Sequence, residues 1–286
     1  MKLLRYGPAG LEKPGILDDQ GRIRALSSVV PDFGADSLGV AQLEKIRQVA
    51  IDSLPIEPSG SRLGTPYRGV GKFIAVGLNY SDHAAEAGLA VPTEPVLFMK
   101  ATSCITGPND SIMLPKGSLK TDWEVELGVV IGRTARYVSE ANALDCVAGY
   151  CVVHDVSERA YQIERGGTWD KGKGCDTFGP FGPYLVTADE VGDPQSLEMW
   201  LDVNGARMQT GNTQRMIFSV RTLVSYISQF MTLNAGDLIT TGTPPGVGMG
   251  RKPTPVYLKA GDVVELGISK LGKQRQAVVA YSEASA

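Results

Sequence analysis

Two glutamates alternate with apolar residues in one short segment of this chain. Glu124 and Glu126 lie in the run Asp-Trp-Glu-Val-Glu-Leu-Gly-Val-Val-Ile, residues 122–131. The period of two predicts a β-strand whose apolar side chains share one face. Both carboxylates then project from the other face, where one cation could bind them together. Because like charges on a strand repel each other, we expect a hard ion such as Mg²⁺, which prefers oxygen ligands, to compensate them. A solvated strand face is the alternative interpretation.

A third acid could complete this cation site. Residues 151–155, Cys-Val-Val-His-Asp, predict a second apolar strand that ends at Asp155. Three acids from two strands can form one oxygen cluster and leave coordination positions for substrate and water. His154 should project away from Asp155 if the strand is regular, so we expect it to be packed rather than to be a ligand.

His83 and Glu86 form a candidate acid–base pair. They follow an apolar strand predicted at residues 72–77 and lie three residues apart on the helix predicted from Ser81. A carboxylate beside an imidazole raises its basicity, which suits a general base that takes a proton from water. The alternative is a surface pair without a catalytic role.

Three further segments carry polar residues that could bind an anionic substrate. Arg159 could hold a carboxylate in a bidentate fork, and Gln162 could orient it. Lys173 lies in the glycine-rich segment 166–180, which could close over a ligand and stabilise developing negative charge. Thr243, in the turn-rich run 240–248, could hold a keto or carboxylate oxygen together with backbone N–H groups. Each segment also has a structural interpretation, namely an exposed turn, a solvated loop cation and a tight turn.

Composition narrows the class of protein. The 286 residues are 43% hydrophobic and 21% charged, with a formal net charge of −3, which is typical of a globular protein with a buried core. We expect no nucleic-acid partner, because no basic run follows a strand or helix. No apolar stretch approaches the roughly 20 residues that span a bilayer, and no secretory signal is evident, so we expect a cytoplasmic protein without a membrane partner. The four cysteines fit no zinc-site spacing and are expected to be reduced.

Short strands interrupted by glycine and proline dominate the chain after residue 68. The predicted strands lie at residues 72–77, 96–99, 125–131, 148–154, 183–186, 199–203, 237–241 and 262–268. Only the segments that begin at Ser81 and Ser219 are predicted to be helical there. Many strands and few helices predict a mainly β fold.

The N-terminal segment has its own pattern. Residues 19–21, Asp-Gln-Gly, predict a hairpin turn between two small strands. Asp36 or Ser37 is predicted to cap a helix that Pro55 stops, and residues 55–61 are typical of a linker. We therefore predict a small α+β N-terminal domain, residues 1–68, and a catalytic domain, residues 69–286.

Six motifs, in this order, resemble those of the fumarylacetoacetate hydrolase family. They are Asn-Tyr-x-x-His-x-x-Glu, Phe-Met-Lys, Glu-x-Glu, Asp-x-x-x-Arg-x-x-Gln, Lys-Gly-x-Asp-Thr and Thr-Gly-Thr-Pro-x-Gly-Val-Gly. The resemblance covers roughly residues 70–270. It implies a mainly β, folded-over mixed sheet (a β-roll) and a homodimer. It also implies that Glu124, Glu126 and Asp155 bind Mg²⁺ or Mn²⁺.

The same resemblance implies roles for the remaining motif residues. His83 and Glu86 would activate water, and Lys173 would stabilise the oxyanion. The substrate contacts would be Lys100, Arg159, Gln162, Gly242 and Thr243. His154 departs from the family pattern, which commonly has Asn or a small or apolar residue before the metal-binding Asp.

The whole chain is most similar to bacterial 2,4-diketo-3-deoxy-L-fuconate or L-rhamnonate hydrolases, many of which are labelled ureidoglycolate lyase. This resemblance implies hydrolysis of a C–C bond in a diketo acid, giving pyruvate and a hydroxy acid. A lyase or decarboxylase acting on oxaloacetate or ureidoglycolate is the alternative, and a sugar-acid-binding protein without catalysis is a further one.

Overall fold

The structure is a computed structural model that describes residues 1–82 and 90–283. Its strands are β1 (Lys2–Tyr6), β2 (Lys13–Leu17), β3 (Ile23–Ala25), β4 (Phe73–Gly77), β5 (Val96–Lys100), β6 (Ile105–Thr106), β7 (Ile112–Met113), β8 (Thr121–Asp122), β9 (Val125–Ile131), β10 (Val147–His154), β11 (Ser157–Glu158), β12 (Gly179–Thr187), β13 (Glu198–Val203), β14 (Ala206–Asn212), β15 (Leu238–Thr240), β16 (Val263–Ile268) and β17 (Gly272–Val279). The α-helices of the described residues include α1 (Val40–Arg47), α3 (Glu140–Ala143), α4 (Arg159–Ile163), α5 (Asp170–Lys173), α6 (Ala188–Val191) and α7 (Val220–Ile227). Short 3₁₀ helices lie at Ala35–Ser37, Ile51–Ser53, Thr102–Cys104, Leu144–Cys146, Thr213–Arg215 and Gly248–Gly250.

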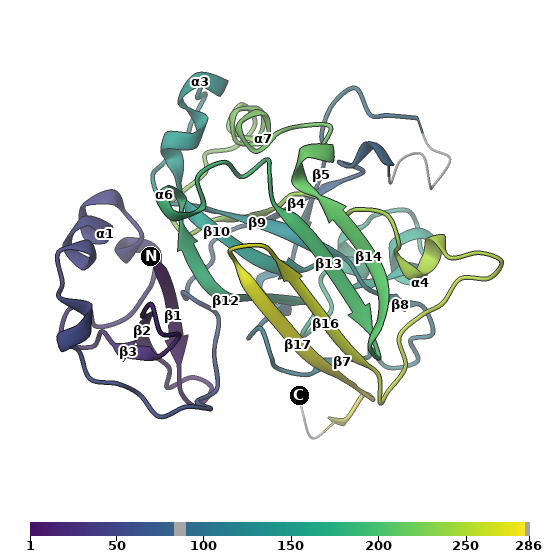
Figure 1. The fold of residues 1–286 in the computed structure, drawn as a ribbon. Coiled ribbons are helices and arrows are strands. Elements are labelled where there is room, and N and C mark those ends of the chain that lie inside the picture. The colour runs from purple at the N-terminus through teal and green to yellow at the C-terminus, as the bar shows by residue number, and fades with distance from the viewer. Residues whose placement is uncertain (83–89, 284–286) are drawn as a thin grey trace.

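Two sheets make up most of the molecule (Figure 1). The larger has the strand order β3-β2-β1-β12-β10-β9-β15-β4-β5, with β6 paired to β12, and the smaller has the order β14-β13-β16-β17-β7. The larger sheet is mixed, because β4 and β15 are parallel whereas β9 is antiparallel to both of its neighbours. The prediction of a mainly β fold with few helices is confirmed.

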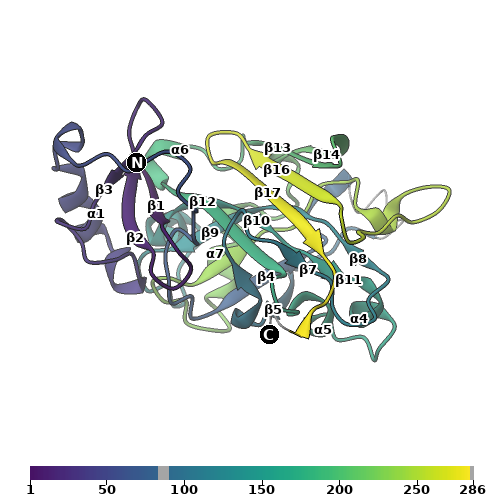
Figure 2. The same cartoon turned by 90° about the horizontal axis from the view of Figure 1, so that it is seen from below.

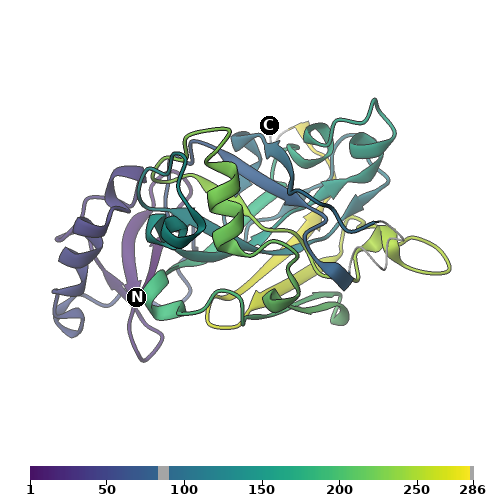
Figure 3. The ribbon, with the colours of Figure 1, turned by 90° about the horizontal axis from the view of Figure 1, so that it is seen from above.

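The smaller sheet and α7 cover one face of the larger sheet. Figure 2 shows β17 passing over β10 and β12. Figure 3 shows α7, in green, lying on the larger sheet away from β17. The alternate apolar residues of β9 pack into this core with Leu201, Val264 and Leu223 from β13, β16 and α7. The opposite face packs a second core, to which β9 contributes Val130 and β10 contributes Cys151 and Val153.

The N-terminal strands continue the larger sheet. β1 pairs with β12, with Leu3 opposite Leu185, and β2 and β3 follow outward from it. The predicted hairpin is present, since β2 and β3 pair antiparallel, and the carboxylate of Asp18 accepts bonds from the backbone N–H groups of Gln20 and Arg22 in the turn. The division at residue 68 stays a prediction.

The predicted N-terminal cap is confirmed for α7 but not for α1. Ser219 caps α7, since its hydroxyl accepts a bond from the N–H of Thr222. The predicted cap at Asp36 or Ser37 is wrong for α1, which begins after Gly39; residues 35–37 form a separate 3₁₀ turn. Among the described helices, none combines the length and the apolar composition that crossing a membrane requires.

Candidate metal centre

The register of β9 against β10 brings the acids of the two strands together. Glu126 is opposite Val153, and Val125 is opposite His154. One step further, the N–H of Asp155 donates to the carbonyl oxygen of Glu124 at 2.9 Å. Because side chains alternate between the two faces, Glu124, Glu126 and Asp155 project from the same face as Val153. A slip of one residue would separate them.

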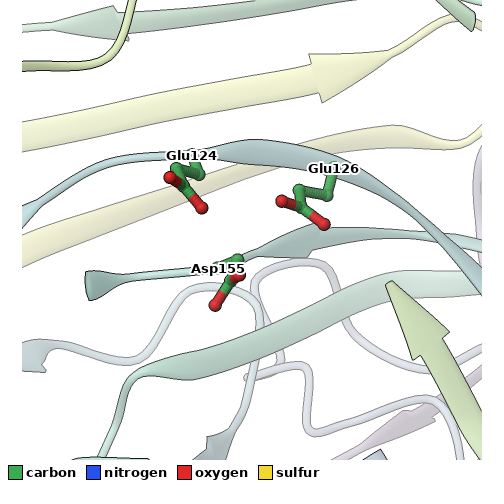
Figure 4. A group of neighbouring side chains, drawn as sticks. All are labelled: Glu124, Glu126 and Asp155. Atoms are coloured by element: carbon green, nitrogen blue, oxygen red, sulfur yellow. The ribbon is translucent and has the colours of Figure 1, made fainter. Parts of the chain in front are cut away.

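The three carboxylates form one compact cluster (Figure 4). One oxygen from each of Glu124, Glu126 and Asp155 lies within 4.8 Å of the other two. All three side chains are buried, with residue exposures of 6%, 2% and 1%. Carboxylate oxygens are the donors that Mg²⁺ and Mn²⁺ prefer, so the residues fit such an ion.

Cationic side chains surround two of these carboxylates. Lys173 Nζ lies 2.6 Å from Glu124 Oε2 and 2.7 Å from Asp155 Oδ2. Lys100 Nζ lies 2.6 Å from Asp155 Oδ1, and Arg159 Nη2 lies 2.6 Å from Glu124 Oε1. The Nε of Arg159 binds Asp122, so that four buried acids, the triad and Asp122, adjoin three buried cations.

Glu126 has a different environment from its neighbours. Its Oε2 accepts bonds from the Thr240 hydroxyl at 2.5 Å and the Gly242 N–H at 2.8 Å. Burial, together with the charges of Asp155 and Glu124, raises the pKa of Glu126 well above its usual value. An acid held in this way is costly to ionise unless a cation binds beside it, which supports a cation site at the cluster.

The pKa of Glu124 is shifted in the opposite direction. Burial acts to raise its pKa, but Lys173 and Arg159 outweigh burial and hold the pKa of Glu124 well below its usual value. The pKa of Lys173 is raised, because the attraction of Asp155 and Glu124 outweighs its burial. These two side chains are therefore an ion pair in the metal-free protein.

A pocket of about 160 Å³ opens above the cluster. The described polar part of its wall comprises the triad, Arg159, Gln162, Lys173, Gly242 and Thr243. The other described residues of the wall are Val76, Gly77, Leu78, Phe98, Ile163, Trp169 and Met249. The structure thus brings the candidate residues of four separate segments to one cavity.

Several candidate residues already have internal partners. Three of the five N–H donors of Arg159 bind Asp122, Glu124 and the side-chain oxygen of Gln162. The Thr243 hydroxyl donates to the Val125 carbonyl and accepts a bond from Gln209. These contacts give both residues a structural role in addition to any contact with substrate.

Lys100 lies beneath the pocket rather than in its wall. It is 1% exposed, and its ammonium donates to Asp155 and to the carbonyl oxygen of Lys173 at 2.5 Å. Lys173 itself is in α5 and is 2% exposed, so the interpretation of a solvated loop cation is wrong. His154 is buried and lies 3.1 Å from Gln276, on the side away from Asp155, as strand alternation predicted. His83 and Glu86 lie outside the described residues.

Sequence reasoning assigned no role to Asp122, Phe98 and Trp169. Asp122 binds Arg159 and the N–H groups of Gly248 and Met249, which ties the cluster to the 248–250 turn. Its position two residues before Glu124 on the same strand face was a usable signal. Trp169 stands in the glycine-rich segment 166–180, where a single aromatic residue gives no such signal.

Comparisons with known proteins agree with this fold and site. A family model described as fumarylacetoacetate (FAA) hydrolase C-terminal matches residues 72–279. The chain therefore belongs to the fumarylacetoacetate hydrolase family. A protein of Burkholderia ambifaria, provisionally named as a hydrolase, is 65% identical over 276 residues, which are 96% of this chain and 98% of that protein.

Two solved structures extend the comparison. The fumarylacetoacetate hydrolase of Exiguobacterium antarcticum has a TM-score of 0.89 and 38% identity, covering 98% of this chain and 100% of that one. Maleylpyruvate hydrolase of Sphingobium sp. SYK-6, solved with manganese(II) and pyruvate, has a TM-score of 0.82 and 28% identity, covering 99% of this chain and 100% of that one. These two relatives are thus named as hydrolases of fumarylacetoacetate and of maleylpyruvate.

Proposed function

We propose that this protein hydrolyses a C–C bond of a 2,4-diketo acid in the presence of Mg²⁺ or Mn²⁺, releasing pyruvate and a second carboxylic acid. One observation carries the proposal: oxygens of Glu124, Glu126 and Asp155 lie within 4.8 Å of one another at a pocket that also contains Lys173. The solved complex of maleylpyruvate hydrolase with manganese(II) and pyruvate supports it.

The charges of the pocket support an anionic substrate. With Glu126 ionised, as a bound cation would require, four buried acids adjoin three buried cations and leave one negative charge in excess. A divalent cation would change the excess negative charge of the site into an excess positive charge. A monoanionic diketo acid would then neutralise that positive charge. Charge balance therefore favours binding of the ion and the substrate together.

The chain's own residues would bind and orient the diketo acid. Arg159 keeps two N–H donors for the substrate carboxylate, and the amide of Gln162 lies beside it. Lys173, held by Glu124 and Asp155, would stabilise negative charge that develops on the substrate oxygens. A bound divalent ion would supply Lewis acidity toward those oxygens.

Water and its activation complete the proposed reaction. The C3–C4 bond breaks, the hydroxyl of water adds to C4 to give a carboxylic acid, and C3 takes a proton to give pyruvate. The family resemblance assigns the activation of water to His83 and Glu86, which lie outside the described residues, and this assignment stays a prediction. Their expected effect is that of a general base, about 10²–10⁴-fold in rate.

The direct test is pyruvate release from synthetic acylpyruvates with and without Mg²⁺ or Mn²⁺. Lys173→Met should lower kcat at least about 100-fold, as expected for the loss of a charge-stabilising donor. Lys171→Met is the matched control, because Lys171 is an exposed lysine of the same helix, α5, and it should stay within about twofold of the wild type. Turnover that is equal in EDTA and in Mg²⁺ would refute the proposal.

A lyase or decarboxylase is the second candidate, because the described cluster could stabilise an enolate from oxaloacetate without activated water. The variant His83→Ala separates the two reactions. It should abolish acylpyruvate hydrolysis if water is activated there, and it should leave oxaloacetate turnover largely intact if the protein is a decarboxylase. Urea and glyoxylate would report cleavage of ureidoglycolate, and ligand binding without any product would indicate a binding protein.

Three finer expectations stay predictions. The 2,4-diketo-3-deoxy sugar acids remain candidate substrates through the sequence resemblance, and their second product would be a hydroxy acid. A homodimer and a cytoplasmic location are also proposed from the resemblance and the composition. Light scattering in solution would test the dimer.

A further inference from the structure

The pocket wall is charged beside the carboxylates and aromatic further away from them. Lys173 Nζ, which binds Glu124 and Asp155, also lies 5.4 Å from the ring centroid of Phe98. The Phe98 ring in turn lies 5.3 Å from that of Trp169, edge to face at 63°. A short path therefore leads from the charged cluster through one lysine to a pair of aromatic rings.

The two rings are held in place by their surroundings. A Cβ at Gly77 would lie 2.3 Å from Cζ3 of Trp169, so the indole packs directly on the β4 backbone. The next residue, Asp170, accepts a bond at 3.1 Å from the N–H of Met99 on β5. The Trp169 segment is thus attached to both strands that form the edge of the sheet, and its ring is a fixed part of the wall.

Apolar side chains make up a large share of the described pocket lining. They are Val76, Leu78, Phe98, Ile163, Trp169 and Met249, and among these six side chains the indole N–H is the single strong hydrogen-bonding group. Ile163 and Met249 are 52% and 37% exposed, which leaves apolar surface at the pocket for a ligand to cover.

We propose that Phe98 and Trp169 form the subsite for the acyl group and select an apolar one. The preferred substrate class is then an acylpyruvate with an alkyl chain of several carbons or an aryl ring, in place of the polyhydroxylated diketo acids that the sequence resemblance favours. This inference rests on the proposed function, because the pyruvate part of the substrate must lie at the carboxylate cluster for the acyl group to reach the rings.

The expected preference follows from desolvation. Each methylene that leaves water contributes about a fourfold gain in kcat/KM, so three or four of them exceed tenfold. A substrate hydroxyl that loses water without a partner is expected to cost about tenfold or more. Hexanoylpyruvate should therefore exceed acetylpyruvate at least about tenfold, and a 2,4-diketo-3-deoxy sugar acid should be the poorest of the three.

Two variants test the role of the rings. Trp169→Ala should reduce the hexanoyl-to-acetyl ratio of kcat/KM at least about fivefold, because it removes one ring of the subsite. Gly77→Ala should reduce the same ratio, since its Cβ displaces the indole. Trp200→Ala is the matched control: this tryptophan lies on β13 against Arg207, outside the pocket lining, and the ratio should not change.

The ratio, rather than the rate, is decisive because Trp169 precedes the helix that carries Lys173. A loss shared equally by all acyl groups would indicate displacement of Lys173 and would overturn the inference. A wild-type protein that prefers the sugar acid would also overturn the inference.

If no acylpyruvate is cleaved with either ion, the proposed function fails. The binding of the uncleaved compounds can then be ranked by the quenching of Trp169 fluorescence, with Trp169→Phe as reference. Tighter binding of the apolar compounds would support the subsite, and equal binding would reject it.

Discussion

The ammonium of Lys100 lies 2.6 Å from Oδ1 of Asp155, and neither side chain is more than 1% exposed. The same ammonium donates to the backbone carbonyl of Lys173 at 2.5 Å. Lys100 thereby fixes both a candidate metal ligand and the backbone of Lys173, which lines the pocket. A buried cation of this kind is a positioning residue whose removal leaves buried acceptors without a donor.

Lys100→Met should therefore destabilise the metal-free protein strongly. Methionine preserves most of the side-chain volume but provides no donor, and breaking a buried ion pair costs about 3–5 kcal/mol. Urea unfolding measures the change. Lys116→Met is the control, because Lys116 pairs with Glu283 at the surface with side-chain exposures of 74% and 80%, and it should change stability by less than about 0.5 kcal/mol. Equal stability of the two variants would contradict the positioning role.

Gly248→Ala should disturb the cluster through Asp122. A Cβ at Gly248 would lie 2.0 Å from the carbonyl oxygen of Val256 and 2.6 Å from Asp122 Oδ1. Overpacking of this kind costs about 1–3 kcal/mol, and the displaced Asp122 would also shift Arg159 and weaken Mn²⁺ binding. Gly39→Ala is the control, since the nearest atom to its Cβ would be 4.0 Å away. Unchanged Mn²⁺ affinity in Gly248→Ala would argue against this coupling.

The N-terminal segment should contribute stability that depends on pH through Asp18. Burial acts to raise the pKa of Asp18, but the Arg22 N–H and the guanidinium groups of Arg24 and Arg22 hold the pKa well below its usual value. A lowered acid pKa stabilises the fold above the unfolded value of about 3.9 and loses that contribution as the pH falls. Asp18→Asn should therefore differ from the wild type more at pH 7 than near pH 4 in urea midpoint. Asp19→Asn, at the exposed neighbouring acid, should show no such trend. A difference for Asp18→Asn that is the same at both pH values would contradict a pH-dependent contribution from Asp18.

Strand alternation predicted much of the structure because it is a local property. The span 125–131 was predicted as a strand and is β9 without change. The same alternation placed Glu124 and Glu126 on one face and His154 away from Asp155. Strands with weaker patterns were missed: the buried positions of β14 and β17 include the glutamines Gln209, Gln274 and Gln276, so their sequences show no apolar alternation.

The partners of the site residues were not predictable in the same way. Lys100 and Asp155 are 55 residues apart, and Thr240 and Glu126 are 114 apart. Their contacts depend on the order of strands in the sheet, which no local pattern specifies. The resemblance to a family supplied the residue types, whereas the internal bonds of Lys100 and Thr243 became visible only in the folded structure.

Mn²⁺ titration followed by electron paramagnetic resonance, on protein stripped with EDTA, is the sharpest test of the proposed metal centre. We expect one ion bound per chain and at least about 10-fold weaker binding in Glu126→Gln, which keeps the side-chain shape but removes the charge. Glu265→Gln, at a partly exposed acid of β16, should bind Mn²⁺ like the wild type. Binding that is absent from the wild type, or unchanged in Glu126→Gln, would contradict a metal centre at these three carboxylates.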